Sequence, residues 1–126
     1  MTGPDGDSGG TAHGLNAFIE PTTSSTLNSL DAAMVEVGKW IRSQAGYLLG
    51  HVKVAVTTSE GTVTLNLTDL ETGVEYHGSL QEGIRADIRF MAAVLDVDHG
   101  ELAERMRDAL LLNGFKLKNK NIIDLG

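Results

Sequence analysis

The sequence contains no cysteine. Disulfides, thiolate metal sites and cysteine nucleophiles are therefore excluded. Aromatic residues form only 5% of the 126 residues, so the core must consist mainly of Val, Leu, Ile, Ala and Met. No apolar run approaches the ~18 residues of a membrane-spanning helix, and we expect no membrane partner. The stretch MTGPDGDSGG contains acids but no Lys or Arg, which argues against a secretory signal and favours a cytoplasmic location.

Basic residues are also scarce. Lys and Arg total 10 against 17 Asp and Glu, and the formal net charge is −7. Because nucleic-acid binding needs a local excess of positive charge, we expect no nucleic-acid partner. The chain has no Gly-rich phosphate loop and no serine in a nucleophile-elbow context. These absences make an enzyme the less favoured class, without deciding the matter, and we expect no cofactor.

The length suits one domain. In residues 1–23, glycines alternate with Asp, Ser and Thr without an apolar period, which predicts a disordered Gly-rich tail. Residues 24–126 are then a single α+β domain. One short apolar patch, residues 17–19, interrupts the tail. It could contact its own domain or serve as a docking motif for a partner.

The first predicted helix spans residues 29–49, with Asn28 as its N-cap and Gly50 as its stop. Apolar residues recur at spacings of three and four and form one stripe, which comprises Leu27, Leu30, Met34, Val37, Ile41, Ala45 and Leu48. Trp40 and Tyr47 flank this stripe. We expect them to widen it into a second contact edge.

Residues 52–76, VKVAVTTSEGTVTLNLTDLETGVEY, alternate between apolar and polar side chains. The alternation predicts a three-stranded antiparallel meander with strands at residues 51–57, 62–68 and 74–78. Gly-containing turns separate the strands. One face of this sheet should pack against the core and the other should face water.

If Val56 pairs with Val63, the polar face contains two cross-strand rows. Lys53, Asn66 and Glu75 form the first row, and Thr64 and His77 lie in the next. This face either meets only water or binds a ligand, with Glu75 and His77 as an acid–base pair or as metal ligands. A working metal site at Glu75 and His77 would want a third ligand near them, and His51 lies at the far end of its strand. We therefore predict no metal site.

Two further helices are predicted. The second spans residues 79–95, where Ser79 and Glu82 match a capping box. The third predicted helix follows Asp98 and ends at Gly114. Glu101 lies three residues after Asp98, at the second position of a capping box. Asp96–Glu101 also resembles the start of a calcium loop, but the twelfth position is Arg107 and not a carboxylate.

Beyond Gly114, residues 115–120 could add a short edge strand, with lysines that discourage pairing between sheet edges. At the end of the third helix, Leu111 and Leu112 make the last turn apolar nearly all round. Such a turn is buried either within the domain or between chains.

The order helix, three strands, helix resembles that of double-stranded-RNA-binding domains. Those domains have a basic run at the start of their second helix, where this chain has the acidic stretch SLQEG at residues 79–83. In size, charge and a leading helix followed by three strands, residues 27–95 resemble small acidic secretion chaperones. Their usual two further strands before the last helix are not predicted here. This resemblance implies a dimer that holds extended segments of a client protein.

The predicted fold class is α+β: a helix, a three-stranded antiparallel meander, two helices packed on one face of the sheet, and a possible short C-terminal strand. The predicted function is a non-catalytic accessory or protein-binding module, a small cytosolic homodimer with Trp40, Tyr47, Leu111 and Leu112 at its interface. The alternative is a small enzyme or a ligand or metal binder that uses Lys53, Thr64, Asn66, Glu75 and His77. The sequence alone does not choose between the sheet surface and the helix surface.

Overall fold

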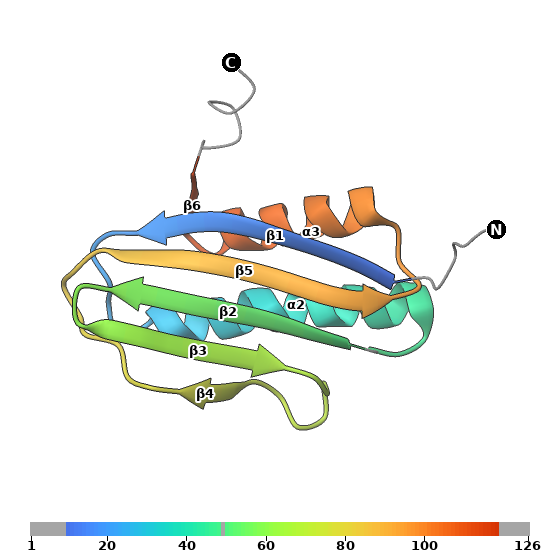
Figure 1. Cartoon of the computed structure of the whole chain (residues 1–126), viewed down its shortest axis with the longest axis horizontal. Helices are drawn as coiled ribbons and strands as arrows, with labels where there is room; N and C mark the ends of the chain where they lie inside the picture. The colour runs from blue at the N-terminus through green and yellow to red at the C-terminus, as the bar shows by residue number, and fades with distance from the viewer. Residues whose placement is uncertain (1–9, 49, 119–126) are drawn as a thin grey trace, which may run out of the picture.

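The computed structural model describes residues 10–48 and 50–118. Its strands are β1 (Gly10–Ile19), β2 (Gly50–Thr58), β3 (Gly61–Leu67), β4 (Glu75–His77), β5 (Ala86–Leu95) and β6 (Lys116–Leu117), and its helices are α2 (Thr26–Ala45) and α3 (His99–Leu112). The strands form one six-stranded sheet in the order β4-β3-β2-β5-β1-β6, and every neighbouring pair is antiparallel (Figure 1). The fold is therefore α+β, as the sequence predicts.

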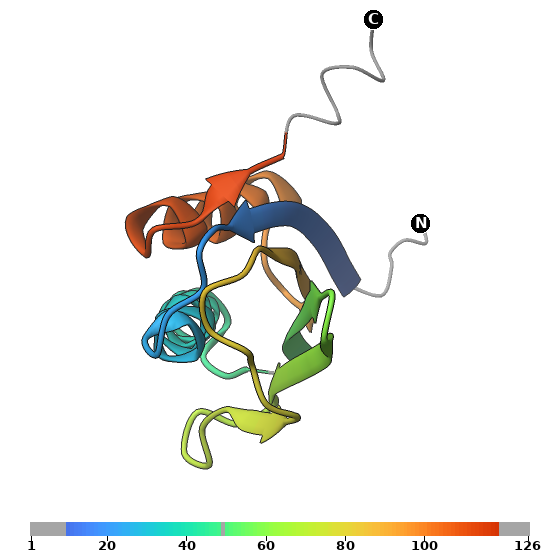
Figure 2. The ribbon, with the colours of Figure 1, turned by 90° about the vertical axis from the view of Figure 1, so that its left-hand side faces the viewer.

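The sheet is strongly curved, and both helices lie on its inner side (Figure 2). α2 contacts β2, β3 and α3, whereas α3 contacts β1 and β6. The core lies between these layers and contains side chains from both, with Phe90, Leu65 and Val54 of the sheet fully buried. On the outer side of the sheet, no helix of the described residues covers the strands, and we call this side the uncovered face.

The apolar stripe of the first predicted helix is confirmed in α2, where Leu30, Met34, Val37 and Ile41 are buried. Its predicted bounds are shifted. Ser25, not Asn28, is the N-cap, and the helix ends where Gly46 adopts a left-handed conformation with φ 87°. Gly46 therefore acts as the stop that was expected at Gly50, because a residue without Cβ adopts this conformation at little cost.

The pairing of the three predicted strands is confirmed. Val56 pairs with Val63, and β3 pairs with β4. The prediction that these strands form the whole sheet is wrong, because β5 pairs with the other side of β2 along its length. The meander is one half of a larger sheet.

The predicted helix at residues 79–95 is wrong. Residues 86–95 form β5, the strand between β1 and β2, and the stretch before it is not helical. The Ser79–Glu82 capping box is therefore not used. Instead the backbone and hydroxyl of Thr22 hold this loop: Thr22 N–H donates to the Ile84 carbonyl (2.7 Å), and Thr22 Oγ1 donates to the Gln81 carbonyl (2.6 Å).

The physical reason for this error is an ambiguous pattern. In ADIRFMAAVL, Ile88, Phe90 and Val94 point to the core with a period of two, but Met91 and Leu95 on the other side are also apolar. Both a helical and a strand period fit such a run. In the described residues, two helices and not three therefore cover the inner face.

The predicted disordered tail is wrong for residues 10–19. These residues form β1, which pairs with β5 over ten positions from Gly10–Leu95 to Ile19–Ala86. Ala17, in the short apolar patch, is fully buried in the core, so this part of the patch packs within its own domain. Residues 1–9 lie outside the described residues.

The third predicted helix is confirmed as α3. Asp98 caps it, because Asp98 Oδ2 accepts a hydrogen bond from Glu101 N–H (3.0 Å). The expected C-terminal strand is present as β6, which pairs with Ala17 and Phe18 of β1. Lys120 and the residues after it lie outside the described part of the chain.

Candidate binding surfaces

The predicted rows on the sheet are confirmed. Lys53 lies opposite Asn66, and Asn66 opposite Glu75; in the neighbouring row, Thr64 lies opposite His77. All five side chains lie on the uncovered face. Among the described residues, no hydrogen bond or ion pair joins them, and Lys53, Glu75 and His77 are exposed. Their role in ligand binding stays a prediction.

The uncovered face concentrates positive charge in an acidic chain. Its basic side chains are Lys53, Arg85, Arg89, Lys116 and Lys118, and its acidic side chains are Glu75 and Asp87. The chain as a whole has a net charge of −7. The acids therefore lie mostly elsewhere, and this face attracts negatively charged groups more than the rest of the surface does.

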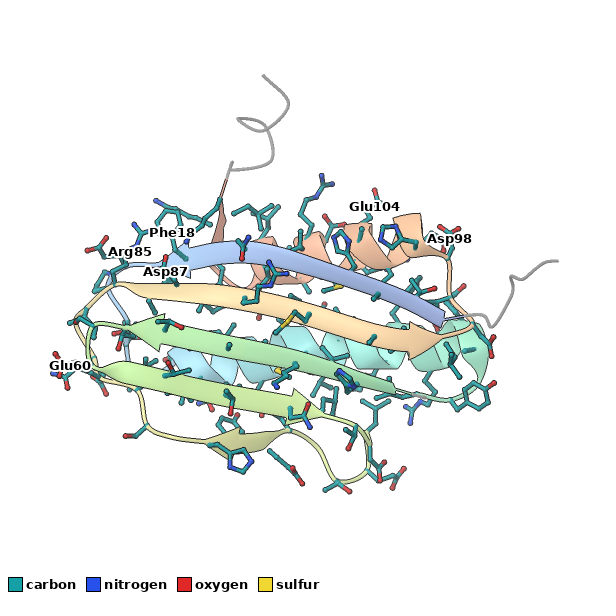
Figure 3. All side chains as sticks on the ribbon, in the orientation of Figure 1. Phe18, Glu60, Arg85, Asp87, Asp98 and Glu104 are labelled. Carbon is teal, nitrogen blue, oxygen red and sulfur yellow. The ribbon has the colours of Figure 1, made fainter. Side chains whose placement is uncertain are left out.

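One end of the uncovered face is tied together by charged contacts (Figure 3). The Arg85 guanidinium lies 4.2 Å from the centre of the Phe18 ring. Asp87 accepts from Lys118 Nζ (2.9 Å) and from Arg85 Nη2 (3.2 Å). The hydrogen bond from Lys118 and then that from Arg85 lower the pKa of Asp87, although partial burial opposes them. These contacts fix β6 to the central strands.

Arg89 lies across β1. Its Nη1 donates to Asn16 Oδ1 (3.2 Å), and its guanidinium occupies the space above Gly14, where a Cβ would approach Arg89 Nη2 to 2.8 Å. Gly14 thus leaves room for a cationic group beside the backbone of β1.

A hollow of about 420 Å³ runs between β1 and α3. We call it the β1–α3 groove, and its lining residues are His13, Leu15, Gly100, Ala103, Glu104 and Arg107. His13 Nδ1 lies 3.3 Å from His99 Nε2 at this place. Partial burial, then the positive charges of His99 and Arg89, lower the pKa of His13.

The predicted interface residues lie in different settings. Trp40 is 9% exposed and lies in the core, with Arg105 5.5 Å from the centre of its ring. Tyr47 is 44% exposed, and its hydroxyl donates to Asp96 Oδ2 (2.8 Å). That bond raises the pKa of Tyr47. The role of Trp40 and Tyr47 in an interface stays a prediction.

Leu111 and Leu112 are 50% and 78% exposed at the end of α3. A hollow of about 550 Å³ lies beside Leu112 and is otherwise lined by Asp31, Ala32, Val35, Glu36, Lys39 and Asn113. Of the predicted interface residues, the two leucines offer the most apolar surface to a partner.

Sequence reasoning missed the β1–α3 groove because one wall lies in the predicted tail. The only signal was the spacing of Leu15, Ala17 and Ile19, which point to the same side of β1. Phe18 on the other side and the glycines at positions 10 and 14 obscure that alternation.

A scan against protein-family models and searches of curated proteins and of solved structures found no match to this chain. In the described ranges, neither helix is long and apolar enough to cross a membrane. The same residues contain no group of three or more His, Asp or Glu side chains placed to hold a metal ion.

Proposed function

We propose that the protein is a non-catalytic protein-binding module that holds an extended segment of a partner against the outer edge of β1. The single observation that carries this proposal is the backbone of that edge at Ala12 and Gly14, where the described residues form no hydrogen bond on the side away from β5. β6 covers β1 only at Ala17 and Phe18, with one further bond from Lys118 N–H to the Asn16 carbonyl (3.0 Å). From Ala12 to Leu15 the edge has no strand beside it in the described chain.

The bond from Lys118 N–H to the Asn16 carbonyl shows which backbone groups of β1 point toward its outer edge. Asn16 points its carbonyl away from β5, and backbone groups alternate along a strand, so Gly14 and Ala12 point theirs the same way. Within residues 10–48 and 50–118, no hydrogen bond reaches the N–H or C=O of Ala12 or Gly14 from that side. An incoming strand would gain about 0.5–1.5 kcal/mol net for each bond formed with them.

β6 supports the same proposal because it shows how a strand sits on this edge. It pairs with β1 while contacting α3, which lies on the inner side of both strands (Figure 2). Leu117 of β6 is partly buried against the core. The β1–α3 groove continues this position along Leu15 and His13, so a partner segment would bury alternate side chains there.

The charges on each side of the edge indicate the chemistry of the partner. A side chain opposite Gly14 would lie on the uncovered face beside the Arg89 guanidinium, and an acidic residue suits that place. A side chain opposite Leu15 would enter the β1–α3 groove, where Leu15 and Ala103 favour an apolar residue. The partner is therefore an extended segment in which an apolar residue adjoins an acidic one.

Replacement of Ala12 by proline tests this proposal, because proline lacks the N–H that faces the free edge while leaving the bonds to β5 in place. The probe is a capped synthetic peptide of alternating Val and Thr with one Glu. We expect the Ala12→Pro variant to bind it about tenfold more weakly than the unchanged protein in an NMR titration.

The matched control is Ala12→Val, which keeps the N–H and adds bulk on the uncovered face. It should bind far better than Ala12→Pro, and a peptide with Lys in place of Glu should bind less well than the Glu peptide. Two results would overturn strand pairing at β1. One is equal affinity of the proline and valine variants for the peptide. The other is that the chemical-shift changes caused by the peptide are confined to α2.

We also infer that a second copy of the chain covers the end of α3. The observation in favour is Leu112, which is 78% exposed beside the hollow that Ala32 and Val35 line. Around a twofold axis, Leu112 of each copy can enter the hollow of the other. Asp31 and Lys39, on the walls of the hollow, carry opposite charges that can pair across the axis.

Sedimentation velocity at several concentrations tests this homodimer. The unchanged protein should dimerise, and Leu112→Asp should be monomeric because it removes the apolar side chain that would cover Ala32 and Val35 in the other copy. Leu95→Asp is the control, since Leu95 is 37% exposed at the end of β5. A monomeric unchanged protein, or equal loss of dimer in both variants, would contradict the inference.

A further inference from the structure

Two of the four histidines are in contact. His13 of β1 and His99, the first residue of α3, place Nδ1 and Nε2 3.3 Å apart. Their rings meet edge to face, with centroids 5.0 Å apart and an angle of 76° between the planes. His51 and His77 lie exposed on the uncovered face without such a neighbour in the described chain.

The separation of the two nitrogens matches that of two ligands on one tetrahedral metal ion. With metal–nitrogen bonds of ~2.0–2.1 Å, a tetrahedral ion holds two nitrogens about 3.3 Å apart. Adjacent ligands of a square-planar or octahedral ion at the same bond length are about 2.9 Å apart. The observed 3.3 Å therefore fits tetrahedral coordination.

The ring positions support the same geometry. If both ring nitrogens aim at one shared ion, the ring centroids lie about 5.1 Å apart. In a straight N–H···N hydrogen bond with this nitrogen separation, they lie about 5.6 Å apart. The observed 5.0 Å is close to the first value. A bent hydrogen bond between the two rings also fits both distances, so metal titration distinguishes the two arrangements.

We propose that His13 and His99 form a two-histidine site for a tetrahedrally coordinated divalent transition-metal ion, and that Zn²⁺ is the ion favoured. Imidazole nitrogen is a preferred ligand of Zn²⁺. Two coordination positions are left for water or for a ligand from a bound molecule. The site thus consists of two residues from distant parts of the chain, and binding of the ion would tie β1 to the start of α3.

The charges around the pair are mixed. The N-terminus of α3 and Arg107 in the β1–α3 groove oppose a cation. The carboxylates of Asp98 and Glu104 stand on the same part of the chain (Figure 3) and offset them.

Calorimetric titration of the tag-free full chain with ZnCl₂ at neutral pH tests the site. We expect one Zn²⁺ per chain, and we expect His13→Ala and His99→Ala each to weaken binding by at least about tenfold. His51→Ala and His77→Ala are the matched controls, and both should bind as the unchanged protein does. Circular dichroism of each variant checks that it is folded.

A second readout reports the geometry. Co²⁺ bound in place of Zn²⁺ should give the intense visible absorption of a tetrahedral ion, and this band should disappear in His99→Ala. Absence of Zn²⁺ binding at millimolar concentration, equal weakening by the control variants, or a weak octahedral Co²⁺ spectrum would each overturn the proposal. None of these results bears on the peptide titration, because the metal ligands are side chains whereas the peptide binds to the backbone.

Discussion

Replacement of Phe90 by alanine is expected to lower the free energy of unfolding by about 3–5 kcal/mol. Phe90 is fully buried and lies in β5, which pairs with β1 on one side and β2 on the other. Removal of its ring leaves a cavity between the sheet and the helices. Chemical denaturation followed by circular dichroism measures the change.

Met91→Ala is the matched control, because the neighbouring side chain points to the uncovered face and is only partly buried. We expect it to cost about 1 kcal/mol or less. If Phe90→Ala does not fold, Phe90→Leu should still be less stable than Met91→Ala. Equal losses at residues 90 and 91 would contradict a strand with one buried face.

Replacement of Gly50 by alanine is expected to destabilise the protein by about 3 kcal/mol. Gly50 begins β2 with φ 120°, and a Cβ on it would overlap the carbonyl oxygen of Ala93 in β5. A backbone atom cannot move aside without breaking the pairing of β2 with β5. The same denaturation experiment measures the loss.

Gly61→Ala controls for the cost of backbone conformation alone. Gly61 has φ 142°, but a Cβ on it would meet nothing within 4 Å. We therefore expect a smaller loss, about 1 kcal/mol. A Gly50→Ala variant as stable as Gly61→Ala would mean that β2 does not approach β5 as closely as described.

The elements with one clear period could be predicted from the sequence. The stripe of Leu30, Met34, Val37 and Ile41 predicted α2, and strict alternation predicted β2 and β3 with the pairing of Val56 and Val63. Asp98 and Glu101 predicted the start of α3. In each case a local pattern agreed with the final packing, so no distant part of the chain was needed to choose the structure.

The two strands that sequence reasoning missed depend on each other. β5 has apolar residues on both sides, and β1 contains Gly14 and Asn16 among its apolar residues. Each forms a strand because it pairs with a distant segment, at a separation of more than 65 residues between Ile19 and Ala86. The local spacing of apolar residues does not indicate such long-range pairing. The β1–α3 groove and the His13–His99 contact could not be predicted for the same reason.

For the polar rows on the uncovered face, the structure could be predicted from the sequence but the function could not. Their arrangement was predictable, because strict alternation decides which side chains share a face and so constrains the register of β2, β3 and β4. Their function was not, since Lys53, Asn66, Glu75 and His77 make no contacts that single out a chemistry. The edge of β1 at Ala12 and Gly14, which carries the proposed function, consists of backbone groups, and side-chain patterns do not encode it directly.

Amide hydrogen exchange at Ala12 and Gly14, followed by NMR with and without the Glu-containing peptide, tests strand pairing most directly. The account predicts that both amides exchange rapidly in the protein alone and become protected together when peptide binds. Two results would contradict it. One is unchanged exchange at both amides with peptide bound. The other is protection that exists without peptide and disappears when the residues after Lys118 are removed, which would make the chain's own C-terminal residues the occupant of this edge.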